Sequence, residues 1–341
     1  MVIDYPVIII SFLLSFLIVL LAMPYWIRRA HGAGLVGRDM HKRDGRNVAN
    51  LGGLVVVCAF IFGTLAYVAI DTFVIAHKDP AIFLQRDLQI MAALVTLLLL
   101  TVLGLVDDIL GWKIGLRQWQ KPVFALFAAI PLAVVNAGQT TMALPLIGKL
   151  DIGILFPIVI IPLAVSGASN GFNMIGGYNG LESGMGALIL AALAYFAWLT
   201  DHSYAAVLAL CMVFALLAFY VYNRCPAKVF PGNVLTYAVG GLIATVAILG
   251  NVERIALVLF LPYFIEFILK ARGHFRKESF AKVTYDGSLD APYQKIYGLE
   301  HLAIRILKQF KRHVSEPNVV HAIFAFEIAL MLFVYLLYRV L

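Results

Sequence analysis

Ten apolar stretches alternate with polar segments along the chain. They cover residues 6–27, 51–70, 88–106, 122–135, 152–165, 187–199, 204–222, 235–249, 255–269 and 319–341. A helix that crosses the hydrocarbon core of a bilayer needs about 20 apolar residues, and several of these stretches are shorter. We therefore expect an all-α, polytopic integral membrane protein of about ten transmembrane helices, some broken, some extended into polar flanks and some shielded by neighbours.

Composition supports this expectation. Of 341 residues, 62% are hydrophobic and only 13% are charged, about half the charged share of a soluble domain. We expect one transmembrane domain over residues 1–341, with a cytoplasmic insertion at about 270–318.

The stretch 6–27 is followed by Arg28 and Arg29 and preceded by no basic residue, so it is not typical of a cleaved signal peptide. We expect an uncleaved first span with its N-terminus outside.

The basic residues lie on one side of this ten-span topology. The loops after the odd-numbered spans hold 21 of the 26 lysines and arginines. The other five are Lys78, Arg86, Lys149, Arg254 and Arg339. Cytoplasmic loops carry such an excess, so both termini are predicted outside and the basic face in the cytoplasm. The net charge of +7 then indicates an inner face that attracts anions, and nucleic acid need not be invoked.

Two adjacent carboxylates, Asp107 and Asp108, end the apolar stretch 88–106. Charged side chains at membrane depth are costly and usually functional. Two in a row repel each other unless a cation lies beside them, and a divalent metal that carries phosphates is a common partner. A helix end in the headgroup region is the simpler alternative, but it explains one aspartate better than two.

Lysines in the first two basic loops are candidates for binding anions. Lys121 lies at the start of a helix that begins with Pro122, where a cation opposes the helix dipole unless an anion binds there. A snorkelling lysine is the alternative. Lys42 in the first loop is a candidate to bind substrate, and attachment of that loop to anionic lipid is the alternative.

The segment 169–184 is the least ordinary loop. It contains three asparagines, five glycines and one glutamate, and no basic residue. Asn170 and Asn173 are spaced to share a helix face. Asparagine oxygens can ligate a hard cation or pair with a base or sugar, and glycines let backbone N–H groups approach a ligand. Asn179, Gly177 and Glu182 belong to the same candidate site. A flexible turn is the alternative.

Cations surround a glycine in the fifth basic loop, where Arg272, His274 and Arg276 occur within five residues. This pattern suits phosphate binding, because arginine offers a bidentate fork, although a positive-inside anchor is an equal alternative. Carboxylates and amides suit Mg²⁺, the cations suit a diphosphate, and a membrane-surface site suits a lipid. The residues together predict Mg²⁺-dependent phosphoryl chemistry between a soluble phosphate ester and a membrane lipid.

Five motifs in order resemble a known family. They are Asp107-Asp108 followed by Lys121; Asn170-x-x-Asn173; Asn179-Gly180-Leu181-Glu182; Phe230-Pro231-Gly232-Asn233; and the loop with His274 and Arg276. This order is similar to that of the polyprenyl-phosphate N-acetylhexosamine-1-phosphate transferases, over residues 34–312. The Asn-Gly-Leu-Glu tetrad resembles the eukaryotic and archaeal dolichyl-phosphate GlcNAc-1-phosphate transferase branch most, and the histidine triplet of the bacterial muramoyl-pentapeptide branch is missing.

The resemblance implies ten spans, a cytoplasmic-side site, a homodimer and Mg²⁺, with Mn²⁺ as an alternative. It implies that UDP-GlcNAc and polyprenyl (dolichyl) phosphate give polyprenyl-diphospho-GlcNAc and UMP, a first membrane step of glycan assembly such as N-glycosylation. By motif, the two aspartates flank the lipid phosphate. Lys121 and Arg276 hold phosphates, Gly177 and Asn179 lie near the nucleotide, and His274 lies near the sugar. The implied metal ligands are Asn173, Asn233 and Asp108.

The sequence departs from the family at two positions. The family usually has aspartate where this chain has Asn233, so the ligand oxygen there would carry no charge. The third acid of the bacterial pattern is replaced by Gly111, as in the eukaryotic-like branch.

Two alternatives remain open from the sequence. One is the same chemistry with another UDP-N-acetylhexosamine. The other is a transporter of a phosphorylated metabolite, because Glu266 and Glu327 lie within apolar stretches and have no role in the proposed site. Polar residues crowd the inner face rather than the bilayer midplane, and no inverted repeat is found, which favours the enzyme.

Overall fold

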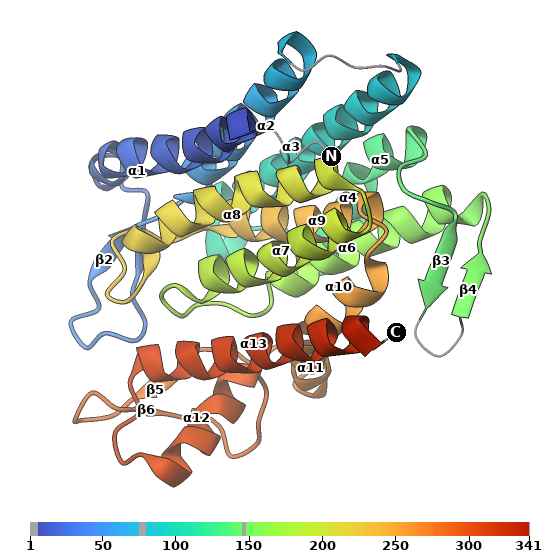
Figure 1. Ribbon diagram of the computed structural model, residues 1–341. Coiled ribbons are helices and arrows are strands. Elements are labelled where there is room, and N and C mark those ends of the chain that lie inside the picture. The colour runs from blue at the N-terminus through green and yellow to red at the C-terminus, as the bar shows by residue number, and fades with distance from the viewer. Residues whose placement is uncertain (1–5, 75–79, 145–147, 341) are drawn as a thin grey trace.

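Helices occupy most of every predicted apolar stretch in the computed structural model, which describes residues 6–74, 80–144 and 148–340 (Figure 1). A 3₁₀ turn, η2 (Pro6–Ile8), precedes α1, and a π-helical segment, η3 (Phe156–Ile160), precedes α6. The α-helices in chain order are α1 (Ile9–Gly32), α2 (Gly53–Phe73), α3 (Pro80–Ile114), α4 (Gln120–Ala128), α5 (Ile130–Val134), α6 (Ile161–Phe172), α7 (Leu181–Leu199), α8 (Ser203–Asn223), α9 (Asn233–Leu249), α10 (Glu253–Leu259), α11 (Leu261–Arg272), α12 (Leu299–Phe310) and α13 (Glu316–Val340).

Six helices of the described chain are long and apolar enough to cross a membrane. They are α1, α2, α7, α8, α13 and the Phe83–Gly111 part of α3. Three shorter apolar helical segments cover Gln120–Val134, Phe156–Phe172 and Asn233–Leu249. The chain is therefore an integral membrane protein, while the number of ten spans stays a prediction. Broken helices were expected. The stretches 122–135 and 255–269 are each split into two helices, with Pro131 and Pro262 in the first turn of the second.

The core of the bundle is built around α9. Every residue from Val234 to Leu249 is buried, and α9 packs against α2, α3, α6, α7 and α8. A helix that is apolar on all sides fits only the centre of such a bundle. Gly104 on α3 lets that helix approach the start of α9, because a Cβ atom there would lie 2.5 Å from the backbone oxygen of Asn233.

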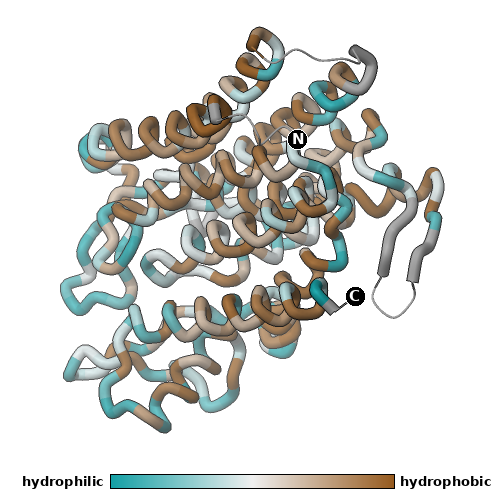
Figure 2. Tube along the Cα trace, viewed as in Figure 1, coloured by the Kyte–Doolittle hydropathy of each residue, from teal (hydrophilic) through white to brown (hydrophobic). Residues whose placement is uncertain are grey.

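The outer surface of the bundle is apolar. Large apolar side chains are exposed on α1, α3 and α13; they include Leu13, Leu17, Leu21, Leu98, Leu99, Val102, Leu332, Phe333 and Leu336. A soluble monomer rarely exposes such continuous apolar faces, so they are suited to contact with lipid. Figure 2 shows the hydrophobic helices in brown and the hydrophilic segments, in teal, gathered in connecting loops and around α12.

Three antiparallel hairpins correct the all-α prediction, although the structure is mostly helical. They are β1 (Val36–Arg38) with β2 (Asn47–Ala49), β3 (Thr141–Leu144) with β4 (Gly148–Asp151), and β5 (Lys282–Val283) with β6 (Leu289–Asp290). Ala49 also forms a parallel bridge to Val229, and its carbonyl accepts the Phe230 N–H at 2.7 Å. The first loop therefore packs against the segment that leads into α9.

Two local boundaries differ from the sequence prediction. The loop expected at 169–184 is shorter, since α6 continues through Phe172 and α7 begins at Leu181. Packing of α6 against α9 outweighs the weak helix propensity of its Ser, Asn and Gly residues. Lys121 lies inside the first turn of α4 instead of before it.

Candidate active site

Asp107 is the centre of a buried polar cluster where α3, α4 and α9 meet. Its Oδ2 accepts hydrogen bonds from Lys121 Nζ at 2.6 Å and from Asn233 Nδ2 at 2.7 Å. Its Oδ1 accepts the Leu116 N–H at 3.0 Å. Both carboxylate oxygens are therefore occupied, and Asp107 fixes the position of one cation and one amide. Lys121, which the sequence assigned to an anion, is thus the cation beside one of the two aspartates.

Asp108 binds the N-terminus of α9. Its Oδ2 accepts the Val234 N–H at 3.0 Å, where a carboxylate is favoured by the helix dipole. Gly232 precedes the helix with a φ of 72°, and a Cβ atom on it would lie 2.6 Å from Asp108 Oδ2. Glycine at this position thus permits both the backbone turn and the approach of the carboxylate.

Asn170 and Asn173 both face α9, as their helical spacing predicts. The Asn173 Oδ1 accepts a hydrogen bond from the Thr236 hydroxyl at 2.6 Å. The Asn170 Oδ1 accepts one from the Tyr237 hydroxyl at 3.2 Å, and its Nδ2 donates to the Ser166 carbonyl at 2.8 Å. Asn170 of α6 and Asn173, which follows the last residue of α6, thereby contact α9 one turn after Asn233.

The donor set of this cluster fits a hard cation. Asn233 directs its NH₂ group to Asp107, so its Oδ1 remains an available acceptor, and Asp108 Oδ1 has no hydrogen bond among the described residues. Carboxylate and amide oxygens are ligands that Mg²⁺ accepts together with water and phosphate. Of the predicted ligands, Asp108 and Asn233 offer free oxygens, whereas Asn173 Oδ1 is engaged by Thr236.

A second buried cluster surrounds Glu316, at the start of α13, and consists of Asp39, His41, Lys42, Asn179 and Glu316. Glu316 Oε1 accepts the Asn179 N–H at 2.7 Å, and its Oε2 accepts Lys42 Nζ at 2.6 Å. Burial lowers the pKa of Lys42, but the hydrogen bond and charge of Glu316 outweigh it and leave that pKa raised. The predicted substrate lysine is thus a charged partner of Glu316.

His41 in the Glu316 cluster carries its proton on Nδ1. Its ring contacts that of Tyr178, with centroids 4.2 Å apart and the planes tilted by 34°, and its Nε2 accepts the Ala281 N–H at 3.1 Å. The proton of the neutral ring therefore belongs on Nδ1, which lies 3.5 Å from Glu316 Oε1. Asp39, His41 and Glu316 are close enough to surround a metal ion.

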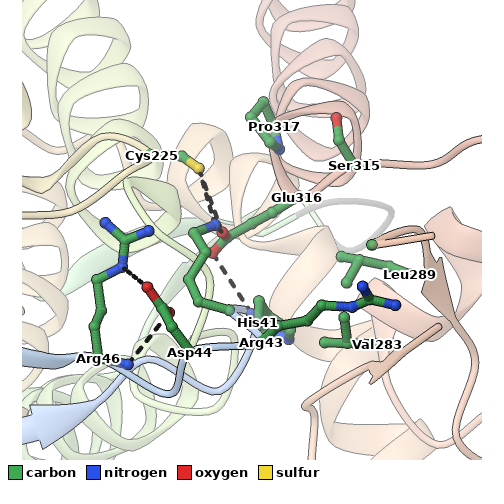
Figure 3. Close-up of a pocket in the computed structure, with 12 residues that line it drawn as sticks. His41, Arg43, Asp44, Arg46, Cys225, Val283, Leu289, Ser315, Glu316 and Pro317 are labelled. Atoms are coloured by element: carbon green, nitrogen blue, oxygen red, sulfur yellow. Dashed lines mark hydrogen bonds and ion pairs between the residues drawn. The ribbon is translucent and has the colours of Figure 1, made fainter. Parts of the chain in front are cut away.

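An open pocket of about 490 Å³ adjoins the Glu316 cluster (Figure 3). Its lining includes His41, Lys42, Arg43, Arg46, Cys225 and Glu316. Figure 3 shows the Arg46 side chain paired with Asp44, and the ion pair measures 3.4 Å. Water can therefore reach the cluster from this side.

Glu182, in the first turn of α7, contacts the glycine-rich segment, residues 173–180, which connects α6 to α7. Its side chain is buried, and its Oε1 accepts the Gly177 N–H at 2.9 Å. Gly177 has a φ of 85° and is itself exposed. The structure therefore gives Glu182 a contact with the segment that was expected to bind substrate, and leaves Gly177 at the surface.

Arg272, His274 and Arg276 are exposed, in keeping with a role in binding a soluble anion. No hydrogen bond of their side chains is found within the described chain. The Phe275 carbonyl accepts a hydrogen bond from Gln118 Nε2 at 3.0 Å, which joins this loop to the segment before α4. The fifth loop thus lies beside the segment that leads to Lys121.

Sequence reasoning missed Asp39, His41, Thr236, Tyr237 and Glu316. The signal for Glu316 was weak, because an acid before a proline at the start of a helix is also typical of a favourable helix terminus. Thr236 and Tyr237 lie within an apolar stretch and follow Asn233 at helical spacing, which could have indicated them.

An apolar groove lies beside the aspartate cluster. It has a volume of about 380 Å³ and is lined by Leu99, Val102, Leu103, Val106, Leu116, Phe124, Phe127 and Ala128, from α3, α4 and the segment between them. Val106 directly precedes Asp107, and Phe124 follows Lys121 by one helical turn. The groove therefore lies on an apolar flank of the bundle, next in sequence to two residues of the polar cluster.

Two buried carboxyls lie close together near α12. A Cβ atom on Gly298 would lie 2.8 Å from Glu300 Oε2 and 3.4 Å from Glu266 Oε1, and Lys270 Nζ is 3.5 Å from the same Glu266 oxygen. Burial, and then the Glu266 charge, raise the pKa of Glu300 well above its usual value. Glu300 is outside the membrane-spanning helices, and its environment favours the protonated carboxyl over the charged one.

We expect Glu300→Gln to stabilise the protein at pH 8 and to have little effect at pH 5. The unfolded carboxyl ionises near pH 4.5, so above that pH wild type loses about 1.4 kcal/mol of stability per pH unit until the folded pKa is reached. Glutamine removes this loss. The melting temperatures of wild type and variant in detergent, at pH 5 and pH 8, measure this difference in stability. Glu278→Gln, at an exposed acid, is the control. A gain that is equal at pH 5 and pH 8 would contradict the assignment.

Apolar helices around buried carboxylates, amides and a lysine define an integral membrane protein with a polar centre at the N-terminus of α9. Residues 90–251 match glycosyl transferase family 4. A protein of Saccharolobus solfataricus, provisionally named UDP-N-acetylglucosamine–dolichyl-phosphate N-acetylglucosaminephosphotransferase, is 36% identical over 308 residues, 90% of each chain. The chain belongs to glycosyl transferase family 4, which confirms the resemblance found in the sequence, and it is a transferase.

Other relatives include members of both branches considered from the sequence. UDP-N-acetylglucosamine–dolichyl-phosphate N-acetylglucosaminephosphotransferase of Dictyostelium discoideum is 25% identical, over 69% of this chain and 64% of its own. Phospho-N-acetylmuramoyl-pentapeptide-transferase of Halalkalibacterium halodurans is 30% identical, over 74% of this chain and 78% of its own.

Proposed function

We propose that the protein transfers GlcNAc-1-phosphate from UDP-GlcNAc to a polyprenyl (dolichyl) phosphate, giving polyprenyl-diphospho-GlcNAc and UMP. The observation that carries the proposal is the 36% identity over 90% of both chains with the Saccharolobus relative named for this activity. The geometry supports it, because the Asp107 cluster combines acids, amide oxygens and a lysine beside an apolar groove.

We propose that the acceptor binds in the groove between α3 and α4, with its phosphate toward Lys121. Apolar side chains contact the prenyl chain, and the ammonium of Lys121 attracts the phosphate at the groove's end. A phosphate monoester has a second pKa near 6, so the acceptor is largely dianionic at neutral pH. It needs little help from a base, and the complete hydrogen bonding of Asp107 favours an orienting role for that carboxylate.

In the transfer step, an oxygen of the lipid phosphate attacks the sugar-bearing β-phosphorus of UDP-GlcNAc. The new P–O bond forms as the bond from that phosphorus to the α-phosphate oxygen breaks, and UMP leaves with the electron pair. Lys121 and the exposed Arg272, His274 and Arg276 supply positive charge for the diphosphate and the sugar phosphate. Gly177 and Asn179 are proposed to contact the nucleotide, with Lys42 nearby.

Mg²⁺ is proposed at the Asp108 and Asn233 oxygens, with Asn173 in its neighbourhood. When bound, the ion would neutralise charge that develops on the leaving phosphate.

The same proposal includes ten spans, a catalytic face in the cytoplasm, both termini outside and a homodimer. Residues 1–5 and 341 lie outside the described part of the chain.

An assay of UMP release tests the proposed function. Purified protein in detergent is incubated with polyprenyl phosphate and, in parallel, UDP-GlcNAc, UDP-GalNAc or UDP-MurNAc-pentapeptide. UMP release that requires both UDP-GlcNAc and the lipid phosphate is the expected result. Release with another sugar nucleotide would change the donor, as the muramoyl-pentapeptide relatives allow. No release with any donor, together with uptake of a phosphorylated solute by proteoliposomes, would favour a transporter.

Asn233 provides a test of the metal proposal. We expect Asn233→Asp to lower the Mg²⁺ concentration for half-maximal activity by about tenfold, because a third carboxylate adds about 1.4 kcal/mol of attraction. Asn233→Ala should raise that concentration. Turnover of the aspartate variant can fall even so, because tighter metal and diphosphate binding slows UMP release. Superimposed Mg²⁺ titrations of wild type and both variants would exclude Asn233 as a ligand.

A further inference from the structure

Asn179 donates three hydrogen bonds to acids outside its own segment. Its N–H donates to Glu316 Oε1 at 2.7 Å, and its Nδ2 donates to Asp39 Oδ2 at 3.0 Å and to Glu316 Oε2 at 3.4 Å. Both the backbone and the amide of this buried residue are therefore fixed. The Oδ1 atom has no hydrogen bond among the described residues, so it can accept one from a substrate.

Glu316 is itself fixed from two other directions. Lys42 Nζ donates to its Oε2 at 2.6 Å, and the protonated His41 Nδ1 lies 3.5 Å from its Oε1. His41 is held in turn by the Ala281 N–H and by the Tyr178 ring. The Glu316 carboxylate thus joins the first loop, whose His41 lies near it in Figure 3, to Asn179, and His41 extends the contact to Ala281.

We propose that Glu316 is a positioning residue that sets the geometry of Asn179 for binding the sugar nucleotide. The inference rests on the proposed function, because it takes Asn179 as a contact of that substrate. Glu316 acts through Asn179, because its Oε1 accepts the Asn179 N–H and its Oε2 accepts Lys42 Nζ and the Cys225 thiol. The charged acceptor suits this role, because hydrogen bonds to an ionised group are about twice as strong as neutral ones.

Two substitutions separate the charge of Glu316 from its hydrogen bonds. Glu316→Gln keeps one acceptor for the Asn179 N–H but places an NH₂ group or a neutral oxygen against Lys42. Glu316→Met keeps the length of the side chain and leaves both partners without an acceptor. Exchange of the Asn179 amide hydrogen with solvent should rise from wild type to the glutamine variant and again to the methionine variant, by about tenfold at each step.

Two controls distinguish this contact from general loosening. Cys225→Ala removes a thiol that accepts a hydrogen bond from Lys42 Nζ at 3.3 Å and donates one to Glu316 Oε2 at 3.4 Å, but that makes none to Asn179 among the described residues. Glu327→Gln makes the same chemical change in a buried acid of the same helix, one whose carboxyl oxygens have no partner within the described chain. Exchange over residues 174–184 should equal that of wild type in both controls.

The functional measurement is steady-state kinetics with both substrates varied. In Glu316→Gln we expect the KM for UDP-GlcNAc to rise about tenfold, with the KM for the lipid phosphate and kcat within about threefold of wild type. A merely structural role would lower the active fraction, and so kcat, without this selective rise.

Two results would overturn the inference. One is unchanged exchange at Asn179 in both Glu316 variants. The other is faster exchange with an unchanged KM for UDP-GlcNAc in an active enzyme, since Glu316 would then hold a segment that does not bind the donor. Either result leaves the proposed function in place, provided wild type releases UMP. Failure of wild type to release UMP from UDP-GlcNAc would overturn both.

Discussion

Asp107→Asn and Asp108→Asn are each expected to lower kcat by at least about 100-fold, because charge organised at a phosphate-transfer site contributes effects of this size. The two losses have different origins. Asparagine at 107 removes the negative acceptor that holds Lys121 and Asn233. Asparagine at 108 removes the charge at the N-terminus of α9 and a proposed metal ligand.

Turnover of UMP release at saturating substrates measures these effects. Asp44→Asn is a suitable control, because Asp44 is an exposed acid outside both clusters. Its kcat should match wild type. Near-normal turnover in both the Asp107 and Asp108 variants, with an unchanged melting profile, would remove the carboxylate pair from the proposed mechanism.

Removal of divalent metal is expected to abolish activity. The free oxygens of Asp108 and Asn233 carry one negative charge between them, so they hold a cation that also depends on water and phosphate ligands. Such a site should release its ion to EDTA, and activity should return with added Mg²⁺ or Mn²⁺.

A chelator can also act on the detergent or the protein directly, so EDTA saturated with Mg²⁺ is the control and should leave activity intact. Full activity after exhaustive chelation would remove the metal, and with it the ligand roles of Asp108, Asn173 and Asn233. The transfer would then depend on Lys121 and the arginines of the fifth loop for charge neutralisation.

The main elements of the site could be predicted because the sequence places them at the ends of apolar stretches. Asp107, Asp108, Lys121 and Asn233 all lie at such ends, and the motif order indicated that they belong together. Their pairing could not be predicted. Asp107 reaches Asn233 because Gly104 lets α3 approach α9, and a glycine in an apolar stretch does not show which helix it contacts.

The Glu316 cluster could not be predicted for a related reason. Asp39, Asn179 and Glu316 are more than 130 residues apart from one another, and each has an ordinary local explanation as a loop or helix-end residue. The breaks in the helices were easier to predict from the sequence than this cluster. Pro131 and Pro262 lie inside apolar stretches, where a missing N–H favours a new helix start. Hydropathy alone averages over such positions.

If the acceptor binds in the groove between α3 and α4, the two proposed substrates reach the protein from different phases, one from the bilayer and one from water. Phe124 and Phe127 are exposed on the flank of the bundle, so an acceptor seated there arrives by lateral diffusion within the bilayer, while the nucleotide arrives from water. The relevant measure for the acceptor is then its mole fraction among lipids. Adding inert lipid or detergent dilutes the acceptor in the surface and slows the reaction, although the number of acceptor molecules in the tube is unchanged.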